Sequence, residues 1–328
     1  PYRAPFLGGA AMTMAAAGVG VANALHANGR ESREWAAIGR ATQWINSPPL
    51  TVASVEGKVV LVQFCTYTCI NWLRTLPYIR AWAQKYRQGL VVIGVHTPEF
   101  EFEHNLDNVK RAMQQMRIEY PIVLDNDYAI WRAFRNQYWP ALYLLDPRGR
   151  IRHQHFGEGE YQQSELAVHR LLPDPKPADG FVTVTGMGVE AAPDWSNLKS
   201  AETYLGSRWT ESFASQQGNW PFVGAWTIGR QAARLSRPSG RLVYRFHARD
   251  LHLVMGPSRP GGSIRFRVSV DGQPPAAAHG VDVDAGGHGV AVDQRMYQLI
   301  RQPGRIAARR FEIEFLDAGI GALAFTFG

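Results

Sequence analysis

Two cysteines, Cys65 and Cys69, are the residues of this sequence best suited to chemistry. They stand four residues apart in the segment KVVLVQFCTYTCINWLRTLPYIRAW, residues 58–82, and the sequence has no other cysteine. Cysteines this close do not cross-link distant parts of a 328-residue chain, so a chemical role is favoured over an architectural one. Thiolates attack disulfides, and two neighbouring thiols pass on two electrons when they close a disulfide. The spacing Cys-x3-Cys therefore predicts redox chemistry.

A strand and a helix are predicted on either side of these cysteines. Residues 58–65 form a continuous apolar run of strand length, typical of a strand that is covered on both faces. Residues 69–87 are predicted as a helix that is interrupted near Pro77. Cys69 then opens the helix, where peptide N–H groups and the helix dipole stabilise a thiolate. We therefore predict that Cys69 is the attacking sulfur.

The sequence leaves three states of the cysteine pair open. A Cys65–Cys69 disulfide requires Cα atoms within about 4.4–6.8 Å of each other, whereas four extended residues span about 13 Å. The chain at residues 66–68 must therefore fold back, as one turn of a helix does. A reversible disulfide is the preferred interpretation. A lone reactive Cys69 and an inert pair are the alternatives.

The periodicity of residues 31–172 predicts an α/β domain with a mixed sheet and helices on both faces. Besides the first strand, strands are predicted at residues 90–97 and 120–125 and in a hairpin over residues 140–156. The hairpin turn, DPRG at residues 146–149, has the proline and glycine of a tight reversal. Further helices are predicted at residues 103–118, 126–138 and 160–172.

The rest of the chain divides into three segments. Residues 173–180 are proline-rich and are predicted to be a stiff linker. Residues 181–328 show short alternating apolar runs between Gly, Pro and Asp turns, which predict an all-β sandwich or jelly roll. Residues 1–30 are a signal-like or tail segment, because small apolar residues follow Arg3 and lead to A-x-A-like steps. This segment favours an extracytoplasmic location, in the periplasm or cell envelope.

The cysteine segment resembles the thioredoxin family. In that family a strand leads to Cys-x-x-Cys, and a helix proline stands eight residues after the first cysteine. Cys69 and Pro77 match these two positions, and VLVQF matches the strand. The sequence departs from the pattern at two places, with Trp72 at the second cysteine position and Cys65 where the strand-end tryptophan usually stands.

A wider likeness is to the TlpA/DipZ-type extracytoplasmic thiol-disulfide oxidoreductases, with a C-terminal domain that resembles carbohydrate-binding modules. It rests on TYTCIN, RTLPY, VIGVHTPEF, DNDYAIWRAFRNQYWPALYLLD, RHQHFGEGEY and SAETYLGSRW, and it covers residues from about 35 to 328. The fold that this resemblance implies is thioredoxin-like, followed by the sandwich. The implied partners are protein thiols and disulfides, a membrane thiol reductase, and carbohydrate through the C-terminal domain.

The resemblance also implies roles for single residues. Cys69 would attack a disulfide of an envelope protein, and Cys65 would resolve the mixed disulfide. Trp139 and Pro140 in QYWPALYLLD match the family's cis peptide, which faces the cysteines and helps to hold a substrate chain. Trp72 and Thr66 are further candidates for positioning the substrate, although helix packing is the simpler interpretation of Trp72.

Two other functions compete with disulfide exchange. Thr66 and Cys69 fit the Thr-x-x-Cys of peroxiredoxins, with Arg135 as a candidate partner for a peroxide. Val62 stands where that family has a proline, and a solvated surface position is the preferred interpretation of Arg135. The second alternative is a non-catalytic binding protein whose sandwich binds carbohydrate or a protein. Its candidate platform consists of aromatic residues, Tyr204, Trp209, Trp220, Phe222 and Trp226.

Charged residues and histidines supply weaker candidates. Glu99, Glu101 and Glu103 are possible proton acceptors for Cys69, but their alternation favours a solvated face. His96 ends a core strand, where a structural role is preferred over contact with the cysteines. His153 and His155 share a strand face without a third ligand nearby in sequence, so no metal site is predicted, and no cofactor motif is present.

The net charge of +7 raises the question of a nucleic-acid partner. The arginines are scattered along the chain and form neither a basic block nor a basic stripe with interleaved aromatic residues. The sequence therefore predicts no nucleic-acid binding.

Overall fold

The computed structural model describes residues 32–41, 43–172, 180–209 and 222–328. These form two compact units, one within residues 1–66, 78–98 and 113–182, and the other within residues 67–77, 99–112 and 183–328. The signal-like segment of residues 1–30 and residues 173–179 of the expected linker lie outside the described residues. The domain bounds predicted from the sequence stay predictions.

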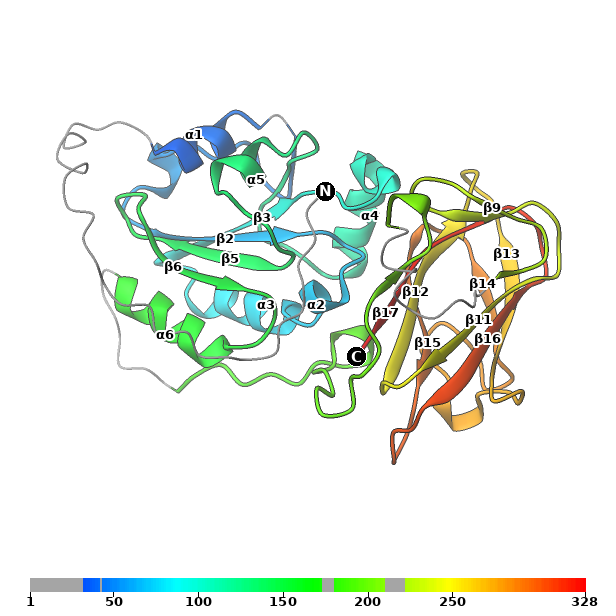
Figure 1. Cartoon of the computed structure of the whole chain (residues 1–328). Helices are drawn as coiled ribbons and strands as arrows, with labels where there is room; N and C mark the ends of the chain where they lie inside the picture. Colours follow the sequence, from blue (N-terminus) through cyan, green and yellow to red (C-terminus); the bar gives the residue numbers. More distant parts are fainter. Residues whose placement is uncertain (1–31, 42, 173–179, 210–221) are drawn as a thin grey trace, which may run out of the picture. The chain divides into compact units, whose positions relative to one another are not determined.

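A mixed six-stranded sheet forms the centre of the first unit (Figure 1). The strand order is β1-β4-β3-β2-β5-β6. β2 pairs in parallel with β3, and β3 with β4, whereas β5 and β6 form the antiparallel hairpin expected around residues 146–149. The bounds are β1 Trp44–Ile45, β2 Val59–Cys65, β3 Leu90–His96, β4 Ile122–Leu124, β5 Ala141–Leu145 and β6 Ile151–Phe156.

Helices cover both faces of this sheet. α1 (Arg33–Gly39) and α5 (Ala129–Ala133) lie on one face, and α3 (Leu76–Lys85) and α6 (Tyr161–Leu171) lie on the other (Figure 1). The seven residues of β2 are all buried, which explains why their sequence is a continuous apolar run rather than an alternating one. Between β1 and β4 the chain also forms α2 (Ile70–Leu73), α4 (Leu106–Gln115) and the 3₁₀ turns η1 (Ala53–Val55) and η2 (Glu101–His104). Of these, α2, η2 and most of α4 belong to the second compact unit.

Phe64, next to the end of β2, is a centre of the core on the α1 and α5 face. Its ring is fully buried and contacts the rings of Trp131, Phe134 and Tyr143 edge to face, at centroid distances of 5.6, 5.3 and 5.7 Å. These partners come from α5, from its C-terminal end and from β5. Packing around Phe64 therefore fixes the end of β2, from which the cysteine segment starts.

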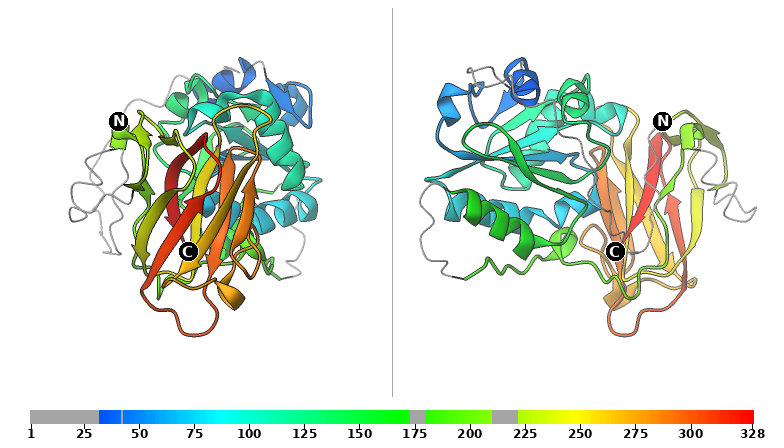
Figure 2. Two further views of the ribbon diagram at one scale, coloured as in Figure 1. Left: turned by 90° about the vertical axis from the view of Figure 1, so that its right-hand side faces the viewer. Right: turned by 60° about the vertical axis from the view of Figure 1, so that its left-hand side comes forward.

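Two antiparallel sheets form the sandwich of the second unit (Figure 2). The first has the order β15-β12-β17-β10-β9, with β7 also paired to β17, and the second has the order β14-β13-β16-β11-β8. The first sheet consists of β7 Thr203–Tyr204, β9 Trp226–Ile228, β10 Ala233–Leu235, β12 Asp250–Pro257, β15 Arg295–Arg301 and β17 Ile320–Phe327. The second consists of β8 Phe222–Val223, β11 Gly240–Phe246, β13 Ile264–Val270, β14 His288–Ala291 and β16 Arg309–Phe315. Single 3₁₀ turns lie at η3 Gly188–Glu190, η4 Ser207–Trp209 and η5 Ala276–Ala278.

The strands of the second sheet show the alternation that the sequence predicted. In β16 the phenylalanines and the isoleucine are buried in the sandwich core, and the intervening glutamates point away from it. The outward residues form ion pairs across strands, Arg241–Glu312 at 3.1 Å and Arg267–Glu314 at 3.0 Å. Part of the excess of arginine is thus matched locally by carboxylates.

The fold class predicted from the sequence is confirmed, both for the thioredoxin-like mixed sheet and for the β-sandwich. One strand was missed, because β1 has only two residues and so carries no periodic signal. The helix expected at residues 126–138 is shorter, since Tyr128 and Arg135 have φ angles of 59° and 53° and bound α5 on both sides. Among the described residues, no helix has the length and apolar character needed to cross a membrane.

The packing around Phe64 generates a stability prediction. Phe64→Ala leaves a cavity among three rings and is expected to lower the free energy of unfolding by about 3–5 kcal/mol. The measurement is chemical denaturation followed by circular dichroism. Phe181→Ala, at a side chain that is 45% exposed, is the matched control and is expected to cost less than about 1 kcal/mol. Equal losses in both variants contradict the prediction.

Candidate functional site

Cys65 lies at the end of the central strand β2, with a neighbour on each side in the sheet. It is fully buried and pairs in register with His96 of β3, and its carbonyl accepts the Thr97 N–H at 2.9 Å. On the other side Phe64 pairs with Ala141, so the next position along the strands places Pro140 beside Cys65. The backbones of Pro140 and Cys65 are thus neighbours at this end of the sheet, and the expectation that Pro140 faces the cysteines and holds a substrate chain stays a prediction. The Trp139–Pro140 peptide is cis, as expected.

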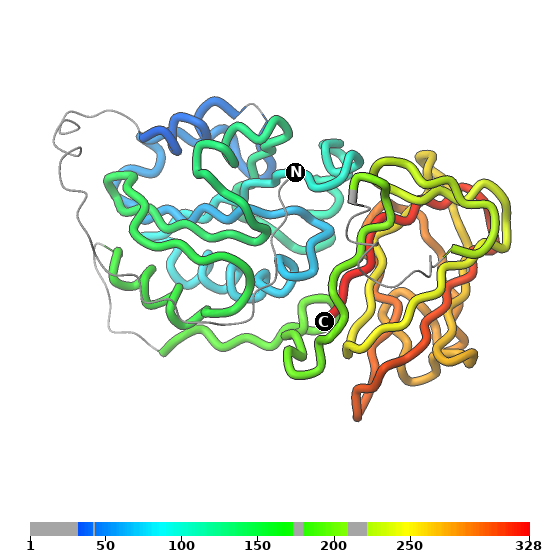
Figure 3. The backbone as a smooth tube through the Cα atoms, in the orientation of Figure 1, coloured from blue at the N-terminus to red at the C-terminus, as the bar shows by residue number. Residues whose placement is uncertain are grey.

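Cys69 follows β2 after three residues and stands directly before α2. Figure 3 shows the path of the backbone, coloured by residue number. Its side chain is half-buried, whereas Cys65 is fully buried. Both cysteines are thiols in the structure, and no disulfide joins them. The two sulfurs therefore differ in access, and only Cys69 is exposed to any extent.

The electrostatic environment of Cys69 differs from the sequence expectation of a stabilised thiolate. Burial raises the pKa of the Cys69 thiol well above its usual value, and the negative charges of Glu99 and Glu202 act in the same direction. Hydrogen bonds from the N–H groups of Trp72 and Asn71 lower that pKa, but they do not outweigh burial. The expected N–H donors at the start of the helix are present. Burial thus opposes the thiolate stabilisation that the sequence predicts for Cys69, and the role of Cys69 as the attacking sulfur stays a prediction.

Glu103 fixes the loop that carries Cys69. Its Oε1 accepts the Thr68 hydroxyl at 2.6 Å, and its Oε2 accepts the N–H groups of Glu99 and Phe100 at 2.7 and 2.8 Å. The side chain is fully buried. The preferred sequence interpretation of a solvated face is therefore wrong for Glu103, because the chain turns into η2 and brings its carboxylate inward. It holds for the exposed Glu101.

A second carboxyl cluster lies near Cys69 in the same unit. The Tyr204 hydroxyl donates to Glu99 and also to Glu202, the latter at 3.2 Å. Glu99 is half-buried, and burial raises its pKa well above the usual value, with the charges of Glu202 and Glu103 adding to the rise. Sequence reasoning proposed Glu99 as one proton acceptor but did not find Glu202. No local pattern connects Glu202 to Cys69 across more than 130 intervening residues.

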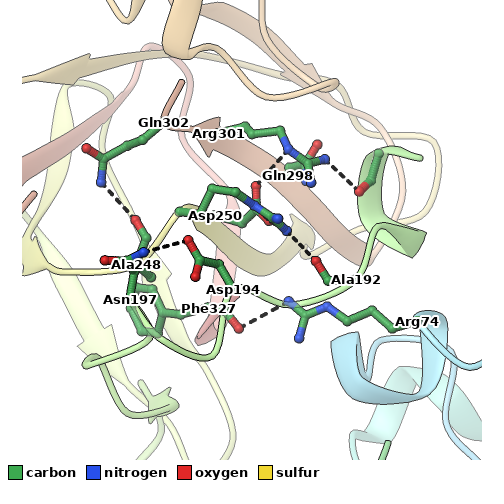
Figure 4. A network of polar contacts seen from close by, with 12 residues as sticks. Arg74, Ala192, Asp194, Asn197, Ala248, Asp250, Gln298, Arg301, Gln302 and Phe327 are labelled. Carbon is green, nitrogen blue, oxygen red and sulfur yellow. Dashed lines mark hydrogen bonds and ion pairs between the residues drawn. The ribbon is translucent and has the colours of Figure 1, made fainter. Parts of the chain in front are cut away.

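Arg74, five residues after Cys69, lies at the edge of another polar network (Figure 4). It is 3% exposed, and its Nη2 lies 3.5 Å from the carbonyl oxygen of Phe327 in β17. The network centres on the buried Asp250, whose carboxylate pairs with Arg249 at 2.7 Å and with Arg301 at 3.4 Å. Within this unit, the segment after Cys69 and the sandwich strands thus share one charge network.

His252, on the same strand as Asp250, is uncharged near neutral pH. The side chain is fully buried, and burial together with the charge of Arg74 lowers its pKa to about 3. The imidazole is therefore neutral across the physiological pH range. Its Nδ1 lies 3.3 Å from the carbonyl oxygen of Thr326.

In the first unit, Asp125 organises the chain after β4. Its Oδ1 accepts the Ile130 N–H at 2.8 Å, and its Oδ2 accepts the Trp131 N–H at 2.8 Å and the Thr97 hydroxyl at 3.2 Å. Burial outweighs these hydrogen bonds and raises the pKa of Asp125 to about 6. The carboxyl group fixes the start of α5 to the residue that follows β3.

The other positions predicted from the sequence fall into two groups. Thr66 and Trp72 are fully buried, and Arg135 is exposed. Trp139 is half-buried, and its ring lies 4.4 Å from that of Trp131. Burial of Trp72 agrees with the helix-packing interpretation, and the exposure of Arg135 agrees with a surface position. The substrate-positioning roles of these residues stay predictions.

Of the aromatic residues proposed as a sugar platform, Phe222 and Trp226 pack against the sandwich core. Trp226 contacts the rings of Phe222 and of the core residue Phe315, at 5.4 and 5.7 Å. Tyr204 contacts Phe100 and the carboxyl groups described above. Trp220 and the side chain of Trp209 lie outside the described residues. In the part of the chain that is described, no group of three or more His, Cys, Asp or Glu side chains is arranged for a metal ion.

Comparison with known proteins identifies the family of this chain. A profile of the AhpC/TSA family matches residues 44–154, and a profile described as thioredoxin like C-terminal domain matches residues 200–328. Thiol-disulfide oxidoreductase YkuV of Bacillus subtilis is 30% identical over 129 residues, which cover 39% of this chain and 87% of YkuV. The chain belongs to the thioredoxin-like thiol-disulfide oxidoreductases.

Similarity to the DipZ proteins extends into the sandwich. Protein DipZ of Mycobacterium bovis and of Mycobacterium tuberculosis is 36% identical over 256 residues, 71% of this chain. The match covers 36% of each DipZ, so the chain spans about a third of the length of these relatives. Among solved structures, a thioredoxin-like protein in the oxidized form has 30% sequence identity and a TM-score of 0.37, covering 40% of this chain and 88% of that chain.

As a thioredoxin-like oxidoreductase, the chain departs from the family pattern in the spacing of its cysteines. Trp72 occupies the second cysteine position of Cys-x-x-Cys, and its indole is fully buried. Cys65, on the strand, is the other cysteine of the chain. If this oxidoreductase closes a disulfide within the chain, the bond joins Cys69 to Cys65.

The Glu103 network generates a prediction for the loop. Glu103→Gln replaces one accepting oxygen with an amide that donates, so part of the hydrogen bonding to Thr68, Glu99 and Phe100 is lost at a buried position. The expected cost is about 2–4 kcal/mol of stability, together with faster hydrogen exchange at the Glu99 and Phe100 amides. Hydrogen exchange followed by NMR measures both residues. Glu101→Gln is the matched control, and unchanged exchange in Glu103→Gln contradicts the prediction.

Asp125 generates a pH prediction. Its pKa in the folded protein, about 6, lies above the ordinary 3.8, so its stabilising contribution is complete below about pH 4 and is lost as the pH rises through 6. A shift of this size corresponds to about 3 kcal/mol. Asp125→Asn removes this dependence. The measurement is the stability difference between parent and variant at pH 4.5 and at pH 7.5, and an equal difference at both pH values contradicts the prediction.

Proposed function

We propose that this chain catalyses thiol-disulfide exchange with proteins of the cell envelope, using Cys69 and Cys65 as a Cys-x3-Cys pair. The observation that carries the proposal is the unequal burial of two thiols four residues apart. Cys69 is half-buried at the start of α2, and Cys65 is fully buried at the end of β2. An accessible thiol suits attack on a substrate, and a sheltered thiol suits resolution of the intermediate.

The proposed reaction balances two electrons and two protons. The Cys69 thiolate attacks one sulfur of a substrate disulfide, so that a mixed disulfide forms and the first substrate thiolate leaves. The Cys65 thiolate then attacks the Cys69 sulfur, which releases the second substrate thiolate and forms the Cys65–Cys69 disulfide. The two protons lost by the cysteines end on the two substrate thiols. The substrate is reduced and the chain is oxidised, and the reverse sequence oxidises a substrate dithiol.

Cys69 must lose its proton before it attacks. The raised pKa of Cys69 keeps the thiol protonated in this arrangement. Glu99 is the proposed proton acceptor, because its own raised pKa makes it a stronger base than an ordinary glutamate. Glu103 serves a different purpose, since its oxygens are engaged in holding the loop.

The substrate is proposed to lie against the chain before β5. Pro140 is adjacent to Cys65 in the sheet register, and Trp139 is half-buried beside it. These two residues are proposed to align the substrate backbone. Thr66 and Trp72 are fully buried, so their proposed contribution is to shape the loop around Cys69 from within.

The location and partners follow from the same proposal. An extracytoplasmic location is proposed from the small apolar residues of the signal-like segment, and protein thiols and disulfides are the proposed substrates, with a membrane thiol reductase as the source of electrons. Carbohydrate is left out of the proposed function, because Phe222 and Trp226 pack against the sandwich core.

A redox titration tests the cysteine pair. The purified chain is equilibrated in glutathione buffers and alkylated, and its intact mass is measured. A reversible two-electron transition between Cys65 and Cys69 is expected. Cys69→Ser is expected to abolish exchange with a disulfide substrate, and Cys65→Ser is expected to accumulate the mixed disulfide. Exchange at parental rate in both variants contradicts the proposal.

A peroxidase is the second candidate, and the match of the AhpC/TSA profile to residues 44–154 favours its inclusion. In that function the Cys69 thiolate attacks a peroxide oxygen and becomes a sulfenic acid, while the other oxygen leaves as water or an alcohol. An external thiol then reduces the sulfenic acid in two exchange steps, so no disulfide with Cys65 is needed. Absence of a titrating disulfide, together with peroxide consumption that depends on Cys69, would replace the exchange proposal by this one. Thr66→Val is then expected to abolish the peroxide activity.

A further inference from the structure

Tyr204 connects two carboxyl groups that come from distant parts of the chain. Its hydroxyl donates to Glu99, which follows β3, and to Glu202, two residues before it, at 3.2 Å. Glu99, Glu202, Tyr204 and Cys69 all belong to the second compact unit. Glu103 links this cluster to the cysteine loop, because its carboxylate accepts both the Glu99 N–H and the hydroxyl of Thr68, the residue before Cys69.

The backbone holds Tyr204 firmly in place. Tyr204 pairs with Ala324 of β17, and the N–H of Leu205 donates to the carbonyl of Leu323 at 2.7 Å. The Thr203 hydroxyl lies 2.9 Å from the hydroxyl of Tyr244. Because Tyr204 lies on a paired strand, its side chain loses little conformational entropy when it binds a carboxyl group. It can therefore position that group.

The titratable groups around Cys69 are mainly acidic. Desolvation raises the pKa of Glu202 to about 7, so its negative charge is complete only above that pH. Glu99 and Glu202 both disfavour the thiolate. Glu103 adds negative charge near Glu99, and Arg208 is the positive group that favours the ionised form of Glu99. The negative charges of Glu202, Glu99 and Cys69 all raise the pKa of Tyr204. Glu202 is exposed and Glu99 half-buried, so the cluster runs from the interior to the surface.

We propose that Tyr204 and Glu202 of the sandwich are positioning residues of the thiol site, which hold the Glu99 carboxyl group and a second negative charge beside Cys69. The sandwich thereby sets the pH at which Cys69 becomes reactive. This inference rests on the proposed function in taking Cys69 as the attacking thiol. Its physical basis is that neighbouring negative charges disfavour ionisation of a thiol, and that the Tyr204 hydroxyl is hydrogen-bonded to both carboxyl groups.

Removal of the Glu202 charge is expected to make Cys69 react at lower pH. In Glu202→Gln, the midpoint of Cys69 alkylation against pH is expected to fall by about half a unit to one unit. This corresponds to about three- to ten-fold faster reaction with iodoacetamide below the midpoint. Peptide mass spectrometry of the full chain identifies the alkylated cysteine. A midpoint equal to that of the parent overturns the inference.

Tyr204→Phe tests positioning as distinct from charge. Without the hydroxyl, Glu99 and Glu202 are no longer held together, so the midpoint is expected to fall in this variant too. The double variant with Glu202→Gln is then expected to shift less than the sum of the two single shifts. Full additivity overturns the positioning role. Glu101→Gln removes an exposed carboxylate two residues from Glu99 and is the matched control, with no expected shift.

The alkylation assay separates this inference from the proposed function. Thiol alkylation requires neither a disulfide substrate nor Cys65, so the midpoint shift is measurable even if the chain shows no exchange activity. A shift without exchange supports the positioning role and rejects the proposed function. Exchange without a shift does the reverse. Circular dichroism and the thermal unfolding midpoint check that each variant is folded. Because the Glu202 side chain is exposed, Glu202→Gln is the variant expected to affect stability least.

Discussion

The arrangement of the thiol site depends on one buried carboxylate, that of Glu103. A carboxylate removed from water is costly unless hydrogen bonds replace its hydration. Here the Thr68 hydroxyl and the N–H groups of Glu99 and Phe100 supply that replacement. Because the Glu103 carboxylate binds all three donors at once, it also keeps the two segments that carry these donors from separating. The loop before α2 and the turn after β3 are thus held by one group.

The balance of forces at Cys69 follows from where this loop is held. Short helices such as α2 offer N–H groups to a preceding side chain, and Cys69 receives this stabilisation from Asn71 and Trp72. Burial and two neighbouring carboxyl groups act against it and prevail. A cysteine directly before this helix can therefore be either a thiolate or a protonated thiol. Its burial and the surrounding charges determine which form is favoured. Fold alone does not set the reactivity of this cysteine.

The sequence predicted most of the fold, because its signals are local. The buried run ending at Cys65, the hairpin turn at residues 146–149 and the alternation in the sandwich strands each reflect a period that a few residues display. The environment of Cys69 was beyond such reasoning. Glu103 and Glu101 alternate in one short segment, yet only the path of the chain into η2 determines that one is buried and the other exposed. Glu202 directly precedes β7, which pairs with β17, and no local pattern in the sequence connects it to Cys69.

The pair formed by Trp131 and Trp139 has a spectroscopic consequence. Two indole rings at 4.4 Å are close enough for their excited states to couple, so this pair should contribute a distinct band to the near-ultraviolet circular dichroism and to the intrinsic fluorescence. Trp139 directly precedes Pro140, where a substrate chain is proposed to lie. The protein thus carries an optical reporter next to the proposed docking position, one that requires no added label and leaves both cysteines untouched.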